Sequence, residues 1–247
     1  MDTALVVPCY NEAGRLPVAD FASFAASHPW LTLVMVDDGS VDDTLRVLQD
    51  LAQRVGPRCR VIARQPNAGK ADAVRAGMQE AFSLHPRFAG YWDADLATPL
   101  QELPRFRDEL LAHDHVDLVL GSRVRLLGHA IDRRAARHYL GRVFATAASV
   151  TLRLPVYDTQ CGAKLFRACE RTEALFAEPF CTGWVFDVEI LARLIRDAGH
   201  EAAQRSLCEL PLHRWRDVAG SRVRPVDFAR AIGELHRIHR RYLSRSA

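Results

Sequence analysis

The sequence predicts an α/β fold in which a mostly parallel central sheet carries helices on both faces. Short apolar runs rich in β-branched residues alternate with segments whose apolar residues recur with the 3.6-residue period of a helix. That alternation is typical of parallel sheets, because each strand must be joined to the next by a crossover helix. The 247 residues, of which 49% are apolar and 26% charged, suit one globular domain.

The predicted elements follow one another in a regular order. Buried strands are expected at residues 3–8, 31–36, 60–63, 89–92 and 117–120. Helices are expected at residues 45–55, 71–84, 101–113 and 135–152, within the segment 178–199, and over residues 226–247. Residues 40–43 (SVDD) resemble a capping signal in front of the first of these helices. Because no Pro-, Gly- or Ser-rich linker divides the chain, we expect a single continuous domain.

The C-terminal helix over residues 226–247 is amphipathic and basic. Its apolar stripe consists of Phe228, Ile232, Leu235, Ile238 and Tyr242. Its charge comes from Arg230, Arg237, Arg240, Arg241 and Arg245. Such a helix can pack on the domain, lie on an anionic bilayer, or do both.

What the sequence lacks disfavours several classes of protein. The dinucleotide fingerprint G-x-G-x-x-G, the phosphate-binding G-x-x-x-x-G-K-[ST] and the serine elbow G-x-S-x-G are all absent. The six cysteines form no C-x-x-C pair, and the net charge of +3 does not indicate a nucleic-acid partner. The first strand begins almost at Met1, and no apolar stretch reaches the roughly 20 residues of a spanning helix. We therefore expect a cytoplasmic protein with no signal peptide and no membrane anchor of its own.

Two carboxylates, Asp93 and Asp95, follow the apolar run 89–92. In an extended segment alternate side chains point the same way, so both should converge where the strand meets a loop. Their mutual repulsion would be relieved by a hard divalent cation that also holds a diphosphate. The pair therefore predicts a metal and diphosphate site.

Polar clusters also follow two other predicted strands. Residues 8–12 (PCYNE) follow the first strand, and residues 37–40 (DDGS) follow the second. Ligands gather at the carboxyl ends of parallel strands, which share one edge of the sheet. We therefore expect these two clusters to form a single site with Asp93 and Asp95.

Four motifs, in order and suitably spaced, resemble the inverting glycosyltransferases of family 2, which have a GT-A fold. They are residues 6–12 (VVPCYNE), 36–44 (VDDGSVDDT), 67–70 (NAGK) and 93–95 (DAD). Residues 158–167 (DTQCGAKLFR) and 184–189 (WVFDVE) are similar to the dolichyl-phosphate β-glucosyltransferase branch, close to dolichyl-phosphate mannose synthases. The resemblance implies a catalytic domain over residues 1–225, with a nucleotide-binding half (1–123) and an acceptor-side half (124–225), before the helix at 226–247.

The resemblance assigns a nucleotide-sugar donor to the first half. The nucleoside pocket would be lined by Pro8, Tyr10, Asn11 and Glu12. Glu12 can accept hydrogen bonds from the ribose, and Tyr10 offers a face to the base. Asp37 would read the edge of the base, with Asp38 beside it.

The phosphates and the metal are assigned to basic residues and to the Asp93–Asp95 pair. Lys70, Arg123 and Arg222 would bind phosphate, for which the planar fork of arginine is well suited. Further candidate arginines are Arg134, Arg142 and Arg216. Asp93 and Asp95 would hold Mg²⁺ or Mn²⁺. In some relatives Asp95 alone contacts the metal while Asp93 faces the ribose, and the sequence leaves both arrangements open.

Three carboxylates are the catalytic candidates of the second half. Asp158, in a glycine-containing turn beside Gln160, is expected near the reacting centre. Asp187 and Glu189 lie at the start of a helix, where they could act as a base, orient the acceptor, or simply complement the helix dipole.

The resemblance implies transfer of a hexose, glucose from UDP-glucose, to a polyprenyl phosphate. A phosphate monoester is largely ionised near neutral pH, since its second pKa is about 6, so such an acceptor needs alignment more than a base. The alternatives are GDP-mannose as donor, a soluble saccharide or metabolite hydroxyl as acceptor, and a nucleotide-binding protein without transfer. A nucleotidyltransferase is disfavoured because residues 8–12 are not a Gly-rich basic loop. A polyprenyl phosphate would place the protein peripherally on the cytoplasmic membrane face.

Overall fold

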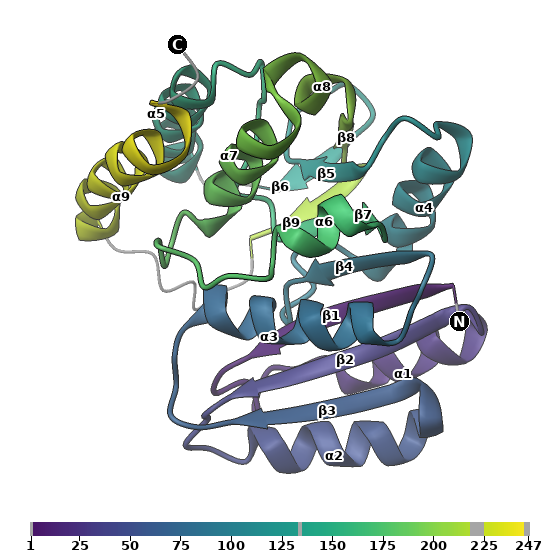
Figure 1. Ribbon diagram of the computed structural model, residues 1–247. Helices are drawn as coiled ribbons and strands as arrows, with labels where there is room; N and C mark the ends of the chain where they lie inside the picture. The colour runs from purple at the N-terminus through teal and green to yellow at the C-terminus, as the bar shows by residue number, and fades with distance from the viewer. Residues whose placement is uncertain (1, 133–134, 218–224, 245–247) are drawn as a thin grey trace.

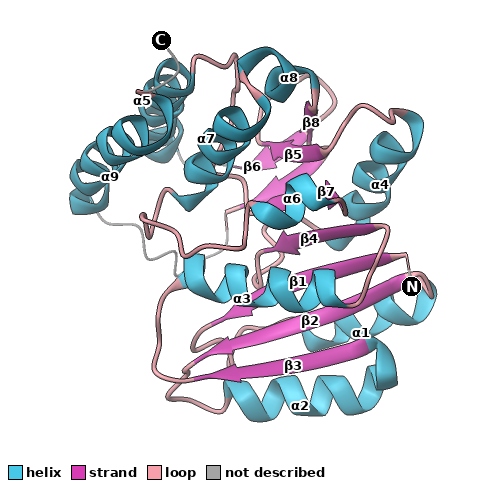
Figure 2. Cartoon of the chain, in the orientation of Figure 1, coloured by secondary structure: helices cyan, strands magenta, loops and turns pink. Residues whose placement is uncertain are grey.

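A seven-stranded sheet forms the centre of the molecule (Figures 1 and 2). The computed structural model describes residues 2–132, 135–217 and 225–244. The strands of this sheet are β1 (Thr3–Cys9), β2 (Leu31–Asp38), β3 (Cys59–Arg64), β4 (Phe88–Trp92), β5 (Leu118–Ser122), β7 (Ala163–Arg167) and β8 (Leu207–Pro211). Their order is β3-β2-β1-β4-β7-β5-β8, and β7 runs antiparallel to both of its neighbours. The predicted mostly parallel sheet is confirmed.

Helices cover both faces of the sheet, as predicted. On one face lie α3 (Lys70–Ser83), α5 (Ala135–Leu152), α7 (Phe186–Ala198) and α9 (Pro225–Ile238). On the other face lie α1 (Val18–Ser27), α2 (Thr44–Val55) and α4 (Leu103–Ala112). The alternation of β1 fits both layers, because Ala4 and Val6 pack into the first while Leu5 and Val7 pack into the second.

The remaining elements are short. They are the helices α6 (Glu170–Ala174) and α8 (His200–Arg205), the 3-10 turns η1 (Gly56–Arg58) and η2 (Leu100–Glu102), and the π-helical turn η3 (His239–Leu243). A separate two-stranded parallel sheet pairs β6 (Ala130–Asp132) with β9 (Arg214–Arg216). Helix α1 and every strand after β5 lie outside the elements predicted from the sequence.

Two predicted details differ in the structure. Residues 40–43 precede α2, but its N-cap residue Asp43 makes no side-chain capping hydrogen bond. Asp42 Oδ1 accepts the Thr44 N–H at 3.0 Å, and Ser40 Oγ accepts the N–H of Asn11. In the segment 178–199 the helix begins only at Phe186. Residues 178–185 instead form a loop that lies beside the C-terminal helix.

The C-terminal helix packs on the domain. In Figure 1, α9 lies beside α5, and both pack against α7. Leu235, Ile238 and Tyr242 of the predicted stripe are buried, whereas Ile232 is 69% exposed. Phe228 lies outside the described side chains.

The strand order reverses between β1 and β4, which is the switch point where α/β sheets bind ligands. The antiparallel direction of β7 brings its first residue, Ala163, opposite Trp92 at the end of β4. The turn at residues 158–162 therefore joins the strand ends at this edge of the sheet.

Candidate active site

The loops that follow β1 and β2 are fastened to each other. Asn11, in the left-handed region with a φ of 53°, accepts the N–H of Val41 on its Oδ1 at 2.9 Å. The Glu12 N–H donates to Thr44 Oγ1 at 2.7 Å, and the Glu12 carboxylate pairs with Arg15. Pro8 and Tyr10 are half-buried beside these contacts. The predicted nucleoside residues therefore lie together.

The adjacent carboxylates Asp37 and Asp38 have different surroundings. Asp38 is saturated, because it accepts hydrogen bonds from Gly69 N at 2.7 Å and Asn67 Nδ2 at 3.0 Å and pairs with Arg64 at 3.2 Å. Asp37 is equally buried, yet its Oδ1 has no hydrogen-bond partner within the described ranges 2–132, 135–217 and 225–244. Buried polar atoms in proteins are nearly always bonded. Asp37 is thus an acceptor suited to a ligand donor, while Asp38 holds the 67–69 loop.

Lys70 neutralises the first carboxylate of the DxD pair. Its Nζ lies 2.5 Å from Asp93 Oδ1. Desolvation lowers the pKa of Lys70, but the carboxylates of Asp93, Asp187 and Asp95 raise it by more. Burial and the charge of Asp93 raise the pKa of Asp95, whose Oδ1 accepts the Ala97 N–H at 3.0 Å.

The Asp93 carboxylate lies directly against Gly162. A Cβ at residue 162 would come within 1.8 Å of Asp93 Oδ2. The Asp93 N–H also donates to the Gly162 carbonyl oxygen at 3.0 Å. The absence of a side chain at Gly162 is therefore what makes room for Asp93. The sequence alone gave no role to this glycine, and the clash becomes evident only when β7 is placed next to β4.

Arg123 and Asp158 form one bidentate pair. Arg123 Nε and Nη2 lie 2.6 and 2.7 Å from the two Asp158 oxygens, and the Arg123 guanidinium stacks 5.4 Å from the Trp215 ring centroid. Burial lowers the pKa of Arg123, but the charge of Asp158 raises it by more. Glu209 accepts the backbone N–H groups of Tyr157 and Asp158 at 2.8 and 2.6 Å. Arg123, which was predicted to bind phosphate, is thus paired with Asp158, which was predicted to be catalytic.

Asp187 binds a fully buried lysine. Lys164 Nζ donates to Asp187 Oδ1 at 2.5 Å and to the carbonyl oxygens of Thr159 and Cys161 at 3.0 and 2.7 Å. The Tyr91 hydroxyl also donates to Asp187. Lys164 has no role in the predictions above, although a lysine inside the apolar run 163–166 is the signal that could have identified it.

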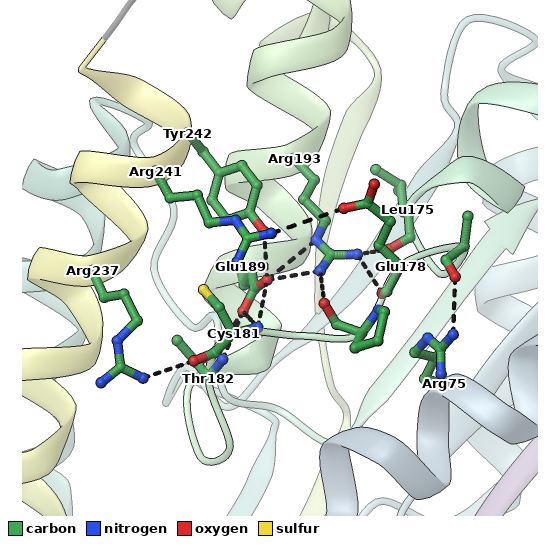
Figure 3. Close-up of polar contacts among 12 residues, drawn as sticks. Arg75, Leu175, Glu178, Cys181, Thr182, Glu189, Arg193, Arg237, Arg241 and Tyr242 are labelled. Atoms are coloured by element: carbon green, nitrogen blue, oxygen red, sulfur yellow. Dashed lines mark hydrogen bonds and ion pairs between the residues drawn. The ribbon is translucent and has the colours of Figure 1, made fainter.

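Glu189 lies in a different buried network, shown in Figure 3. It accepts hydrogen bonds from Thr182 Oγ1, Arg193 Nη2 and the Tyr242 hydroxyl, each at 2.8 Å, and from the Cys181 N–H at 3.0 Å. Burial raises the pKa of Glu189, but these donors lower it by more. Glu189 is fully buried. The structure does not bring it together with Asp187.

The other candidate arginines are dispersed. Arg142 Nη1 lies 3.4 Å from the Tyr157 carbonyl oxygen, and the guanidinium stacks on the Tyr157 ring at 3.7 Å. Arg216 is exposed on β9. Arg134 and Arg222 lie outside the described residues. Among the described residues, no group of three or more His, Cys, Asp or Glu side chains could hold a metal by itself.

The mostly parallel sheet, with carboxylates gathered at its switch point, is the GT-A fold of glycosyltransferases. A solved structure of glucosyl-3-phosphoglycerate synthase from Mycobacterium tuberculosis, in complex with Mn²⁺, uridine diphosphate and phosphoglyceric acid, matches with a TM-score of 0.66. The match covers 96% of this chain and 78% of that chain at 19% identity, so it shows the fold alone.

The family model for glycosyl transferase family 2 matches residues 4–169, and the chain belongs to that family. It is 32% identical over 248 residues to the dolichyl-phosphate beta-glucosyltransferase of Drosophila melanogaster, which covers 91% of this chain and 70% of the relative. The Saccharomyces cerevisiae enzyme of the same name is 30% identical, over 89% of this chain and 68% of the relative. The chain thus spans about two thirds of these relatives. The resemblance found in the sequence motifs is confirmed, and the protein is a glycosyltransferase.

Proposed function

We propose that this protein transfers glucose from UDP-glucose to a polyprenyl phosphate with inversion, in a reaction that requires Mg²⁺ or Mn²⁺. The observation that carries the proposal is similarity to dolichyl-phosphate beta-glucosyltransferases over about nine tenths of the chain. A dodecaprenyl-phosphate galacturonate synthase of Rhizobium johnstonii, 28% identical over 68% of this chain and 48% of that relative, also has a polyprenyl phosphate in its name.

On the donor side, Asp37 Oδ1, which has no partner among the described residues, accepts a base N–H, and Glu12 accepts from the ribose hydroxyls. Tyr10, Pro8 and Asn11 shape the pocket around them. Asp38 acts indirectly: it holds the 67–69 loop and so presents Lys70 to the diphosphate.

The residues present fit a hard divalent cation. Asp93 and Asp95 offer carboxylate oxygens. Burial and the charge of Asp93 raise the pKa of Asp95, and a cation would relieve that charge. Phosphate oxygens of the donor would supply further ligands to such an ion. When bound, the metal neutralises the charge that develops on the departing diphosphate.

On the acceptor side, alignment matters more than proton abstraction. An ionised phosphate monoester attacks the anomeric carbon from the face opposite the UDP, so a single displacement inverts that centre. Arg123 is held rigidly by Asp158 and offers its remaining N–H groups and its charge to a phosphate. Asp187, bound to Lys164, orients the turn at residues 158–162 through the carbonyl contacts of that lysine. We assign Glu189 a structural role, since its carboxylate accepts hydrogen bonds from Thr182, Arg193 and Tyr242 (Figure 3).

A lipid acceptor calls for contact with a membrane surface. Among the described residues, no helix is both long and apolar enough to cross a bilayer. The exposed Arg230, Arg237 and Arg240, together with exposed Ile232, support peripheral binding to an anionic cytoplasmic membrane face.

The test is a transfer assay with Mg²⁺ or Mn²⁺. UDP-glucose and GDP-mannose are each incubated with a polyprenyl phosphate or with phosphoglyceric acid, and products are identified by mass spectrometry. We expect a β-linked glucosyl lipid phosphate from UDP-glucose. Transfer to the soluble acceptor without any lipid product would refute the proposal. A lipid product from GDP-mannose alone would show that the donor is GDP-mannose and not UDP-glucose.

A further inference from the structure

Helix α7 begins without a capping side chain of its own. Its N-cap residue is Val185, which makes no side-chain hydrogen bond to the helix. The N–H groups at the start of a helix lack intrahelical partners and need an acceptor from elsewhere. The loop that leads into α7 has the same need, because it carries the backbone N–H groups of Gly183 and Trp184.

Glu234, on α9, supplies that acceptor. Its Oε2 accepts the N–H of Val185 at 3.1 Å and that of Trp184 at 3.3 Å, and its Oε1 accepts that of Gly183 at 3.4 Å. A carboxylate in this position also complements the positive end of the helix dipole. A residue about fifty positions further along the chain thus binds the N-cap residue of α7 and the two residues before it.

The same segment holds the loop at two more points. Arg237 Nη1 donates to the Cys181 carbonyl oxygen at 2.8 Å, and the Tyr242 hydroxyl donates to Glu189, which binds the N–H groups of Cys181 and Thr182 (Figure 3). Residues 181–185 are therefore fastened to the α9–η3 segment.

The first turn of α7 contains Asp187, whose carboxylate accepts hydrogen bonds from Lys164 Nζ and from the Tyr91 hydroxyl. Since Val185 and Asp187 are two residues apart, a shift of the helix start moves the Asp187 carboxylate. Lys164 in turn binds the carbonyl oxygens of Thr159 and Cys161 in the turn that faces Asp93. A continuous chain of contacts thus runs from α9 to the strand edge.

We propose that Glu234 is a positioning residue: from α9 it fixes the backbone at residues 183–185 and thereby sets Asp187 at the acceptor side. This inference deepens the proposed function and rests on it. It also gives the C-terminal helix a role inside the protein, separate from any contact with a membrane.

The first experiment compares Glu234→Ala and Glu234→Gln with Glu201→Ala, which removes an exposed glutamate paired only with Arg205 among the described contacts. We expect Glu234→Ala to lower kcat on the order of 10-fold, because small misplacements of reacting groups are costly, while KM for UDP-glucose changes less than about twofold. Glu234→Gln retains one acceptor oxygen and should be intermediate. Wild-type kcat in a folded Glu234→Ala variant would overturn the inference.

A second experiment needs no catalysis. Hydrogen exchange of peptides that cover residues 183–188 should accelerate on the order of 10-fold in Glu234→Ala, with no change in β1 or β2. If the wild type transfers no sugar to any lipid phosphate, the proposed function fails and this measurement alone decides the inference. Unchanged exchange at residues 183–188 would overturn it, and faster exchange would retain it.

A double-mutant cycle tests the route through Asp187. If Glu234 acts by placing that carboxylate, adding Glu234→Ala to Asp187→Asn should lower kcat by less than about twofold further. Fully additive losses, or wild-type activity in Asp187→Asn, would contradict action through Asp187.

Discussion

At the scale of single residues, hydrogen-bond partners decide what each carboxylate at the strand ends can do. Asp38 and Asp158 are held by donors of the protein itself, whereas Asp37 keeps a buried oxygen without a partner among the described residues. The pKa of Asp95 is raised by burial and by the negative charge of its neighbour Asp93. Such unfavourable electrostatics is typical of sites that a ligand completes.

Replacing Asp95 by Asn is expected to abolish transfer and to stabilise the protein. A raised carboxyl pKa means that the folded chain holds the proton more tightly than the unfolded chain, so ionisation costs stability as the pH rises through the folded pKa. Tm should therefore increase at neutral pH, by roughly 2–4 °C for each kcal/mol of repulsion removed. The gain should shrink as the pH falls and vanish below the ordinary aspartate pKa of 3.8, where Asp95 is protonated in both the folded and the unfolded chain. Calorimetry from below pH 3.8 to pH 8 measures both effects.

Asp50→Asn is the matched control, because Asp50 is an exposed carboxylate on α2. It should leave transfer and Tm unchanged. A Tm for Asp95→Asn below that of the wild type at neutral pH, or retained transfer, would contradict this reading of Asp95.

Gly162→Ala is expected to impair transfer more than folding. The new Cβ would displace the Asp93 carboxylate, which lies 1.8 Å from its position. We expect overpacking to cost about 1–3 kcal/mol of stability and transfer to fall on the order of 10²-fold. Steady-state kinetics and thermal unfolding measure these losses. Gly233→Ala, at a site with open space around it, is the control, and equal losses in both variants would contradict the argument.

At the scale of elements, helix geometry separates two carboxylates that the sequence presents as a pair. Residues two apart on a helix point about 200° from each other. Asp187 accordingly faces Lys164 on β7, and Glu189 faces Arg193 and the C-terminal segment. The sequence identified the helix and its acidic first turn, but the partners of each acid depend on packing that no local pattern encodes.

Arg193→Ala is expected to lower the free energy of unfolding by about 3–5 kcal/mol, because it leaves Glu189 buried and charged without its cation. The loss should appear in urea denaturation at neutral pH. Since the pKa of Glu189 is lowered in the folded state, the wild type should itself lose this contribution as the pH falls through that folded pKa.

The comparison variant is Arg205→Ala, which breaks an exposed pair with Glu201 on α8. Exposed pairs of this kind contribute roughly 0–1 kcal/mol. A similar loss in both variants would mean that the buried network adds nothing beyond a surface ion pair.

At the scale of the whole molecule, the strands of the first half follow from sequence patterns and those of the second half do not. Strands β1 to β5 each have an apolar run bounded by polar residues, and all five were predicted. Strand β7 contains the buried charge of Lys164, β8 is only half-buried, and β9 is a three-residue strand that is largely exposed. The strand ends that gather the candidate site were likewise predictable, whereas the pairing of Arg123 with Asp158 depends on the antiparallel insertion of β7.

Metal binding is expected to depend on the nucleotide. Since the described part of the chain has no group of three or more ligating side chains, the ion needs phosphate oxygens to complete its coordination. Mn²⁺ alone should raise Tm little, while Mn²⁺ with UDP at about 100 times the Kd should add about 2.7 kcal/mol. UDP with EDTA is the control in a thermal-shift assay. A full shift from Mn²⁺ alone would show that the protein holds the ion unaided.

The contact between Tyr242 and Glu189 spans 53 residues of chain and has a consequence for biosynthesis. A domain generally folds as a unit during synthesis. Because residues 181–189 reach these partners only once Tyr242, and Glu234 before it, have left the exit tunnel, folding of this domain is completed only when nearly all of the described chain has been synthesised.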